Sequence, residues 1–262
     1  MRAPLTALLL PSEESETGAR QRLPSVVALV GAGGKTTLLY GLARLLAAAG
    51  KTVITTTTTH IYPPSAAQSP RLMVDASPAP DAVRRALELH GHLTLARARE
   101  ESTDKLAGFA PEDIAGLAGI ADVVLVEADG AATLPLKAPA AHEPAVPPCA
   151  QLCVAILGLD GVGKLFQEAV HRPENAARLC GAAPDGPVQP GHLSDLALHP
   201  DGLFRTSPRC ARRAVLCHKA DLPETLAVAE QAACEARRRY PDLTVPWYMG
   251  SARKGWIVRL QH

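Results

Sequence analysis

The stretch LVGAGGKTTLL at residues 29–39 combines three glycines with a Gly-Lys-Thr, residue types that together bind phosphate. The common phosphate loop reads G-x-x-x-x-G-K-[ST], which places a glycine six residues before the lysine. Here Leu29 occupies that place, and the first glycine is Gly31, four residues before Lys35. Glycines allow consecutive N–H groups to approach an anion, and a helix beginning near Lys35 would add its positive end. The sequence therefore predicts a shortened phosphate loop.

We expect this loop to bind a nucleotide together with Mg²⁺. Lys35 would reach the β- and γ-phosphates, the Thr36 hydroxyl would bind Mg²⁺, and Thr37 could bond a more distal phosphate oxygen. A glycine-rich β–α turn without a ligand is the alternative. The residues predicted to contact the nucleotide here are Gly31, Ala32, Gly33, Gly34, Lys35, Thr36 and Thr37.

A second stretch, GLDGVGKL at residues 158–165, has the full spacing of the common pattern. Leu165 follows its lysine, however, and leucine has no hydroxyl for a metal ion. We interpret this stretch as a turn, with a second nucleotide site as the alternative.

Carboxylates follow the apolar run VVLVEADG at residues 123–130. Asp129 comes just beyond the predicted strand, where it can hold Mg²⁺ directly or through water. Glu127 is the alternative ligand, or a base that orients a water molecule. A surface Asp-Gly turn would explain the DG pair but not the four apolar residues before Glu127. We expect Lys35, Glu127 and Asp129 to form the catalytic group.

The string HKAD at residues 218–221 closely matches the N/T-K-x-D element of guanine-specific phosphate-loop proteins, with His218 in place of Asn or Thr. Asp221 would accept hydrogen bonds from the N1–H and amino group of guanine, which adenine cannot supply. The stem of Lys219 would cover one face of the base. These residues predict a preference for GTP and leave ATP as the alternative.

The next predicted strand ends in GSAR at residues 250–253, which strengthens the case for a base-binding loop. Ser251 lies at this end, and the backbone N–H of Ala252 could donate to O6 of guanine. Either string alone is a weak signal, and guanine specificity depends on the two together.

Apolar runs without alternation separate these polar stretches, as expected for strands buried on both faces of a parallel sheet. The predicted strands are 25–30, 52–59, 92–98, 122–129, 152–160, 214–221 and 244–249. The predicted helices are 35–49, 81–90, 111–118, 173–180 and 223–239. Most of the strands end in polar residues, and ligands bind beyond the carboxyl ends of strands in such sheets. The fold class predicted is α/β, a doubly wound, mainly parallel sheet of the P-loop NTPase type with helices on both faces.

We expect residues 1–24 to be a flexible lead-in and residues 25–262 to be a single domain. The five threonines 55–59 could place alternate hydroxyls near Mg²⁺ or substrate, or could reflect strand propensity alone.

The composition argues against two classes of partner, nucleic acids and membranes. Lys and Arg number 27 against 26 Asp and Glu, so no charge excess favours a nucleic-acid or membrane-surface partner. No apolar run approaches the roughly 20 residues of a membrane span, and the six cysteines form no C-x-x-C pair. We therefore expect a cytoplasmic protein with reduced thiols, no nucleic-acid partner and no membrane partner.

The strings also occur in the order seen in the YqeC family, a resemblance that covers about residues 25–260. They are VGAGGKTTL, ITTTTTHIYPP, KLAGFAPEDI, VLVEADGAATLPLKAPAAHEPAVP, AILGLDGVGK, HRPE and HKAD. The fourth string is specific to that family, whereas the phosphate loop is not. The chain departs from the family pattern where His218 replaces the usual Asn.

The resemblance implies a nucleotide-binding accessory protein for selenium cofactor biosynthesis, which helps mature selenium-dependent molybdenum hydroxylases. A molybdenum hydroxylase or another cofactor-maturation protein would then be a partner. By the same resemblance Lys137 joins the catalytic candidates, and His142 and Glu143 become candidates for the substrate side.

Two other functions fit the same strings. One is a non-catalytic carrier that binds nucleotide as a switch and delivers the cofactor. The other is an ATP-dependent ligase, because G-x-x-G-K-T-T also resembles the short phosphate loop of Mur-type ligases.

Overall fold

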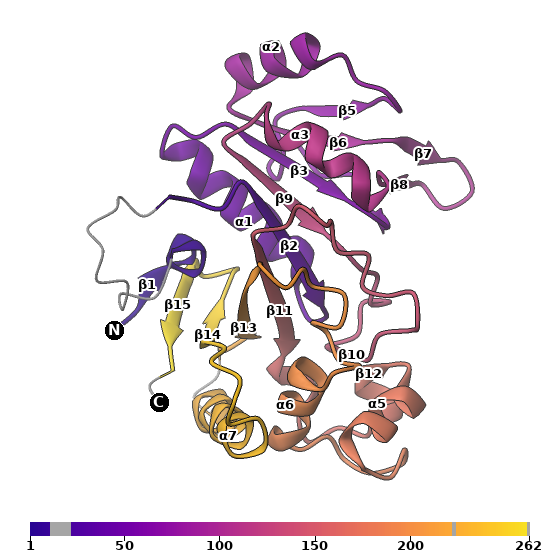
Figure 1. The fold of residues 1–262 in the computed structure, drawn as a ribbon, viewed down its shortest axis with the longest axis vertical. Helices are drawn as coiled ribbons and strands as arrows, with labels where there is room; N and C mark the ends of the chain where they lie inside the picture. Colours follow the sequence, from indigo (N-terminus) through magenta and orange to yellow (C-terminus); the bar gives the residue numbers. More distant parts are fainter. Residues whose placement is uncertain (11–21, 222–223, 261–262) are drawn as a thin grey trace.

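The computed structural model describes residues 1–10, 22–221 and 224–260. A ten-stranded sheet runs through the chain in the order β1-β15-β14-β13-β11-β2-β9-β3-β6-β5 (Figure 1). The strands from β14 to β5 are parallel, and β15 and β1 join one edge antiparallel. The bounds are β1 Ala3–Pro4, β2 Val26–Gly31, β3 Val53–Thr57, β5 Leu72–Val74, β6 His92–Ala96, β9 Val123–Glu127, β11 Leu152–Gly158, β13 Arg212–His218, β14 Trp247–Ser251 and β15 Trp256–Arg259.

Two small sheets lie apart from the large one. The first contains three strands, β4 His60–Ile61, β7 Ala98–Glu100 and β8 Lys105–Ala107, in the order β4-β8-β7. The second pairs β10 Leu136–Lys137 with β12 Val170–His171.

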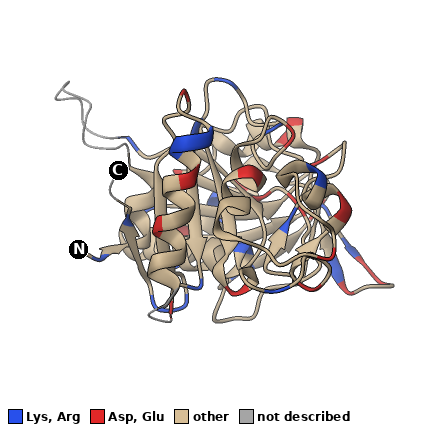
Figure 2. Ribbon diagram, turned by 90° about the horizontal axis from the view of Figure 1, so that it is seen from below, with Lys and Arg blue, Asp and Glu red and all other residues tan. Residues whose placement is uncertain are grey.

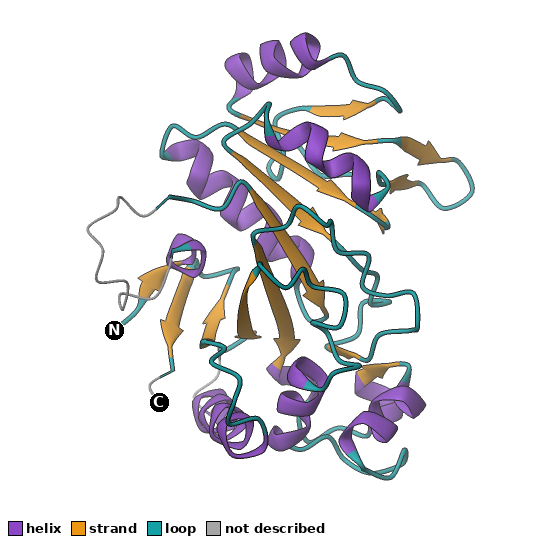
Figure 3. Ribbon diagram, viewed as in Figure 1, coloured by secondary structure: helices purple, strands orange, loops and turns teal. Residues whose placement is uncertain are grey.

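Helices pack on both faces of the large sheet (Figure 3). The α-helices are α1 Lys35–Ala48, α2 Pro80–His90, α3 Ala115–Ala118, α4 Phe166–Ala169, α5 Pro173–Cys180, α6 Pro190–Leu198 and α7 Glu224–Arg239. Three 3₁₀ helices complete the set, η1 Leu5–Leu9, η2 Pro111–Ile114 and η3 Leu159–Gly161.

Strand β2 shows why the sheet is buried on both sides. Its six residues are all buried, and alternate side chains enter two different cores because successive residues of a strand face opposite ways. Val27 and Leu29 pack in the core that contains α1 and η1. Val26, Ala28 and Val30 pack in the core that contains α2, α3, α5, α6 and α7. The continuous apolar run of the sequence is thus explained by burial from both faces.

The mixed α/β architecture and the large, mostly parallel sheet confirm the fold expected from the sequence at this level. The helix predicted at 111–118 is instead η2 followed by the four-residue α3. The predictions missed α6, although Pro190 occupies its first turn, a position where proline is common.

The first ten residues correct the expected boundary of the lead-in. Ala3 and Pro4 pair with Ile257 and Trp256 of β15, and η1 buries Leu5, Leu8 and Leu9 beneath α1. This apolar segment therefore extends the sheet and its core rather than forming part of a flexible lead-in. Residues 11–21 of the predicted lead-in lie outside the described residues.

Charged residues of both signs are interspersed along the ribbon, in keeping with a formal net charge of +1 (Figure 2). Within the described ranges, no helix has the length and apolar character needed to cross a membrane.

We expect the stability of the fold to fall as the pH is lowered from about 6.5 to 4, because His92 is only 3% exposed. Burial lowers the pKa of His92 from 6.5 to about 4. The folded chain therefore keeps His92 neutral while the unfolded chain binds a proton, so protonation favours unfolding. The loss attributable to this group is roughly 3 kcal/mol.

Urea unfolding of the wild type and of His92→Gln between pH 4 and 7 measures this effect. The Gln amide can still meet the Thr55 hydroxyl, which lies 3.1 Å from Nε2 of His92. The difference in unfolding free energy between the two proteins should change across this range. A constant difference would show that His92 does not titrate as described.

Candidate functional site

The predicted phosphate loop, residues 31–37, connects β2 to α1 at the carboxyl edge of the large sheet. Residues 32–34 form the turn, and Gly34 is the N-cap of α1, with φ of 129°. The N–H groups of the five residues 33–37 have no hydrogen-bond acceptor among the described residues, whereas the N–H of Ala32 donates to Ile156 (2.9 Å). Five successive free donors at the start of a helix are an arrangement that can accept an anion.

Close packing explains two of the glycines. A Cβ on Gly33 would lie 2.5 Å from the Cα of Gly158, and one on Gly34 would lie 2.4 Å from the imidazole of His218. Both residues also have positive φ. Only glycine fits these positions, so the loop is held against the ends of β11 and β13.

His218 ties the phosphate loop to the end of β14. Its Nδ1 lies 2.7 Å from the carbonyl of Gly33, and its Nε2 accepts the N–H of Ala252 (2.9 Å). A carbonyl only accepts, so Nδ1 carries the proton and the ring is neutral. Burial lowers the pKa of His218, which favours this neutral form. Because the N–H of Ala252 is engaged, its predicted bond to O6 of guanine is not available in this arrangement.

Lys35 points from α1 to the base of the loop. Its Nζ donates to the carbonyl of Gly31 (2.5 Å) and lies 3.0 Å from Oδ1 of Asp129 and 3.8 Å from Oε1 of Glu127. Burial acts to lower the pKa of Lys35, but these two carboxylates outweigh it and raise the pKa. Lys35 is therefore a fixed cation beside the free N–H groups.

Glu127 and Asp129 follow β9 but have different surroundings. The hydroxyl of Thr36 donates to Oε2 of Glu127 (2.8 Å), and both residues line the cavity described below. Asp129 is fully buried, accepts the N–H of Gly31 at Oδ2 (2.9 Å), and contacts no hydroxyl of the loop. Of the two carboxylates considered as Mg²⁺ ligands, the one beside the Thr36 hydroxyl is thus Glu127 and not Asp129.

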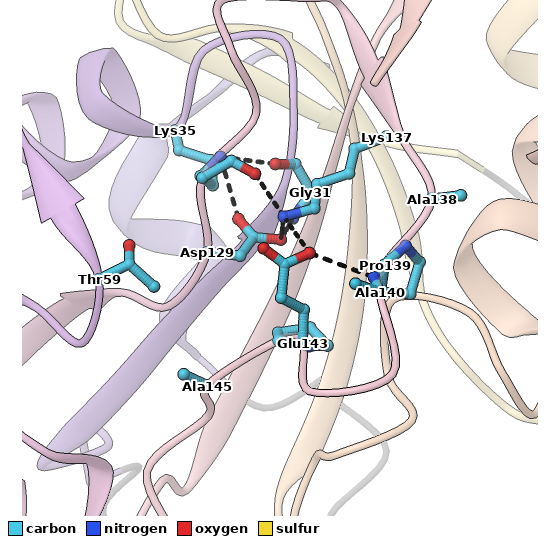
Figure 4. A network of polar contacts seen from close by, with 12 residues as sticks. Gly31, Lys35, Thr59, Asp129, Lys137, Ala138, Pro139, Ala140, Glu143 and Ala145 are labelled. Atoms are coloured by element: carbon cyan, nitrogen blue, oxygen red, sulfur yellow. Dashed lines mark hydrogen bonds and ion pairs between the residues drawn. The ribbon is translucent and has the colours of Figure 1, made fainter. Parts of the chain in front are cut away.

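A chain of buried charges extends from Asp129 away from the loop (Figure 4). Lys137, 0% exposed, lies 3.4 Å from Oδ2 of Asp129 and 3.0 Å from Oε2 of Glu143, and also donates to the carbonyl of Gly130. Arg172 donates to the same Glu143 oxygen (2.5 Å). Although burial opposes it, hydrogen bonds from Lys137 and Arg172 lower the pKa of Glu143 to about 2. Lys137 therefore pairs with Asp129 and Glu143 in the interior, and its side chain is not exposed to the cavity.

A cavity of about 590 Å³ opens in front of the loop. The phosphate loop lines it from Gly33 to Thr37, with Glu127 beside it. The residues lining the remainder are His60, Ile61, Tyr62, Lys105, Gly130, Ala131, Ala132, Thr133, Leu134 and Lys219. Ala132 and Thr133 have positive φ, so part of this lining is a strained loop directly after Asp129.

The predicted base-binding residues are only partly gathered here. Lys219 reaches the cavity, where its Nζ bonds Oδ2 of Asp160 (2.7 Å). Asp221 lies outside that lining, 3.5 Å from Nζ of Lys254. Ser251 is buried and accepts the N–H of Lys254.

His142 and the threonines after Ile54 were also candidates for the site. The structure places neither the first three threonines nor His142 in the cavity lining. The hydroxyls of Thr55, Thr56 and Thr57 bond other groups of the sheet, including the carbonyls of Leu95 and Glu127. His142 is exposed, and it is not part of the Lys137 and Glu143 contacts.

The second glycine-rich stretch, GLDGVGKL at residues 158–165, differs from the phosphate loop in that its backbone N–H groups are not free. The N–H groups of Val162, Gly163 and Lys164 are all paired with carbonyls of the chain. The helix that follows, α4, has only four residues.

Sequence reasoning did not assign Tyr62 or Lys105 to the site. Both residues occur in strings on which the family resemblance rests, ITTTTTHIYPP and KLAGFAPEDI. Their presence in these strings was the only sign in the sequence that they belong to the site. Arg172, in HRPE, was likewise not connected to Glu143.

Comparison with known proteins adds three findings. The model of a protein family described as YqeC protein matches residues 27–174. The uncharacterized protein YqeC of Escherichia coli (strain K12) is 38% identical over 202 residues, which cover 76% of this chain and 77% of that protein. The signal recognition particle receptor FtsY from Elizabethkingia anophelis, in complex with GDP, aligns with 98% of this chain and 67% of its own, at 13% identity and a TM-score of 0.33. A TM-score this low does not establish a shared fold.

Proposed function

The chain belongs to the YqeC family, and we propose that it is a Mg²⁺-dependent nucleotide-binding protein. Residues 25–262 would form one domain of the P-loop NTPase type. The observation that carries this proposal is the row of five free N–H groups at residues 33–37, with the ammonium of Lys35 beside them. Phosphate is the biological anion whose several oxygens match such a row of donors.

The donor set also fits a magnesium ion. The Thr36 hydroxyl and the Glu127 carboxylate are hard oxygen donors that face the same cavity, the ligand type that Mg²⁺ prefers. Asp129 fits poorly, because two lysines and the N–H of Gly31 already surround it. We therefore assign Thr36 and Glu127 as the metal-binding pair, with Asp129 positioning Lys35. When bound, the ion would neutralise charge on the phosphate oxygens.

We propose GTP as the preferred nucleotide and hydrolysis or phosphoryl transfer as the reaction, with ATP as the alternative nucleotide. Lys219 lies at the cavity, and Asp221 follows it by two residues, close enough in the chain to meet a base at that end. Lys35 and the free N–H groups would supply the electrostatic stabilisation on which phosphoryl transfer depends. The biological role proposed is the maturation of selenium-dependent molybdenum hydroxylases.

Asp221→Ala is expected to weaken GTP binding at least about tenfold and to leave ATP binding unchanged, because two charge-assisted hydrogen bonds to guanine are lost. Calorimetric titration of both nucleotides with Mg²⁺ measures this. Asp201→Ala, at another exposed aspartate, is the matched control. Equal affinity of the wild type for GTP and ATP would remove the guanine assignment while leaving the phosphate site intact.

Deletion of the gene in its native host, followed by measurement of selenium in the molybdenum hydroxylases, tests the biological role. The proposal expects selenium to be lost from these enzymes, and an unchanged content would rule the role out. Nucleotide binding without turnover, together with stoichiometric binding to an apo-hydroxylase, would favour a carrier over an NTPase.

A further inference from the structure

The cavity in front of the phosphate loop has a second wall that the proposed nucleotide site does not use. The small sheet β4-β8-β7 and the residue after β4 supply it, through His60, Ile61, Tyr62 and Lys105. In Figure 1 the strands β7 and β8 of this sheet lie beyond the end of β6, at one side of the large sheet. The wall and the phosphate loop thus line one cavity of about 590 Å³.

Backbone bonds pin the wall to the large sheet. The N–H of Gly108 donates to the carbonyl of Thr59 (2.8 Å), and the N–H of Phe109 donates to that of Thr57 (3.1 Å). A Cβ on Gly108 would lie 1.9 Å from the carbonyl oxygen of Thr57, so the two segments are in the closest possible contact. The backbone of the wall is therefore held in place relative to β3.

Lys105 differs from the other basic side chains that line the cavity. Lys35 pairs with Asp129, Lys219 with Asp160, and His60 with Glu100 (2.7 Å). Within the described ranges, the ammonium of Lys105 has no carboxylate within 4.0 Å, and it lies 5.1 Å from the ring centroid of Tyr62. Glu100, the cross-strand partner of Lys105, attracts the ammonium from beyond that distance, while its Oε1 lies 2.7 Å from Nε2 of His60. A half-buried cation that has no close ion pair and faces a cavity is suited to bind an anion.

Tyr62 adds an aromatic surface beside that cation. Its side chain is 62% exposed although it follows the buried Ile61. An exposed aromatic ring beside a lysine offers stacking to a planar group and a charge to an anionic group at the same time.

We infer that Tyr62 and Lys105 form a subsite for a second ligand, a small anionic molecule with a planar ring, which lies across the cavity from the phosphate loop. The inference rests on the proposed function, because it places this ligand opposite the bound phosphates. An acceptor of a transferred phosphoryl group must lie on such a side of the cavity, since the attacking and leaving oxygens are roughly in line. The protein would then bring two ligands together rather than bind a nucleotide alone.

Phenyl phosphate is a probe that has both features, and inorganic phosphate and benzyl alcohol each have one. The chain is first saturated with Mg²⁺ and a non-hydrolysable GTP analogue, so that the phosphate loop is occupied, and each probe is then titrated. We expect phenyl phosphate to bind more tightly than either single-feature probe. Lys105→Ala should weaken its binding about tenfold, and Tyr62→Ala should reduce its affinity to that of inorganic phosphate.

The affinity for the GTP analogue should change less than about twofold in both variants, as it should in Lys51→Ala, a control at an exposed lysine outside the cavity lining. Phenyl phosphate binding that is unchanged in Lys105→Ala would overturn the inference. So would a loss of GTP-analogue binding in that variant, because Lys105 would then belong to the nucleotide site. If the analogue does not bind the wild type at all, the proposed function fails. The titration on the nucleotide-free chain then decides the subsite by the same Lys105 dependence.

Discussion

Lys137→Met is expected to lower the free energy of unfolding by about 3–5 kcal/mol, the usual loss when one partner of a buried ion pair is removed. Lys137 is 0% exposed and lies between Asp129 and Glu143, which are buried as well. Methionine fills a similar volume but has no charge. The two carboxylates would then remain in the interior, with Lys35 and Arg172 as their remaining cations.

Urea unfolding followed by circular dichroism measures this loss. Lys164→Met, at an exposed lysine, is the matched control and should change the unfolding free energy by less than about 0.5 kcal/mol. Adding Glu143→Gln to Lys137→Met should recover part of the loss, because it removes the excess negative charge that Lys137→Met leaves in this network. A loss below about 1 kcal/mol in Lys137→Met would show that the buried pair contributes little to the fold.

Lys35→Ala is expected to weaken nucleotide binding by at least about two orders of magnitude. A lysine that contacts two phosphate oxygens contributes charge-assisted hydrogen bonds of roughly 1.5–3 kcal/mol each, and 1.4 kcal/mol corresponds to a factor of ten. The free N–H groups of residues 33–37 remain in this variant, so weak binding should persist. Calorimetric titration with Mg²⁺ and GTP measures the change.

Lys35 also pairs with the buried Asp129, so its removal affects stability as well as binding. Thermal unfolding of Lys35→Ala shows over which temperature range the variant is folded, and the titration is made within that range. Lys164→Ala, which changes the lysine of the second glycine-rich stretch at residues 158–165, is the control and should bind nucleotide like the wild type. Full affinity in Lys35→Ala would exclude Lys35 from the phosphate site.

The elements of the sheet core could be predicted because their signals are local. A continuous apolar run ending in glycine identified β2, and Lys35 at the start of a helical pattern identified α1. The helix at Pro173–Cys180 was predicted at its observed bounds, since proline and glycine mark its two ends. The parallel register then brings the polar carboxyl ends of these strands to one edge.

The partners within the site could not be predicted, because they depend on contacts between distant segments. Which of Glu127 and Asp129 meets Thr36 is decided by the path of the backbone after β9, where Asp129 turns toward Gly31. The position of Lys137 between Asp129 and Glu143 likewise requires the turn before β10. The spacing of residues in the sequence gives neither the partner of Thr36 nor the position of Lys137.

The role of His218 and the wall of the cavity also depend on contacts between distant segments. His218 was read as an unusual replacement in a base-binding string, whereas in the fold it joins Gly33 to Ala252. The wall of the cavity forms only when Ile61 pairs with Leu106, residues that are 45 positions apart in the chain. Such contacts follow from the assembled sheet and not from local propensity.

The most direct test of the central claim is to follow the backbone amide resonances of residues 33–37 in isotope-labelled protein as Mg²⁺ and GTP are added. We expect large shifts at these five N–H groups, because each would donate to a phosphate oxygen. The shifts at Val162, Gly163 and Lys164 should be small, because their N–H groups are already paired. Unchanged resonances at residues 33–37 under saturating nucleotide would contradict the assignment of this loop as the phosphate site.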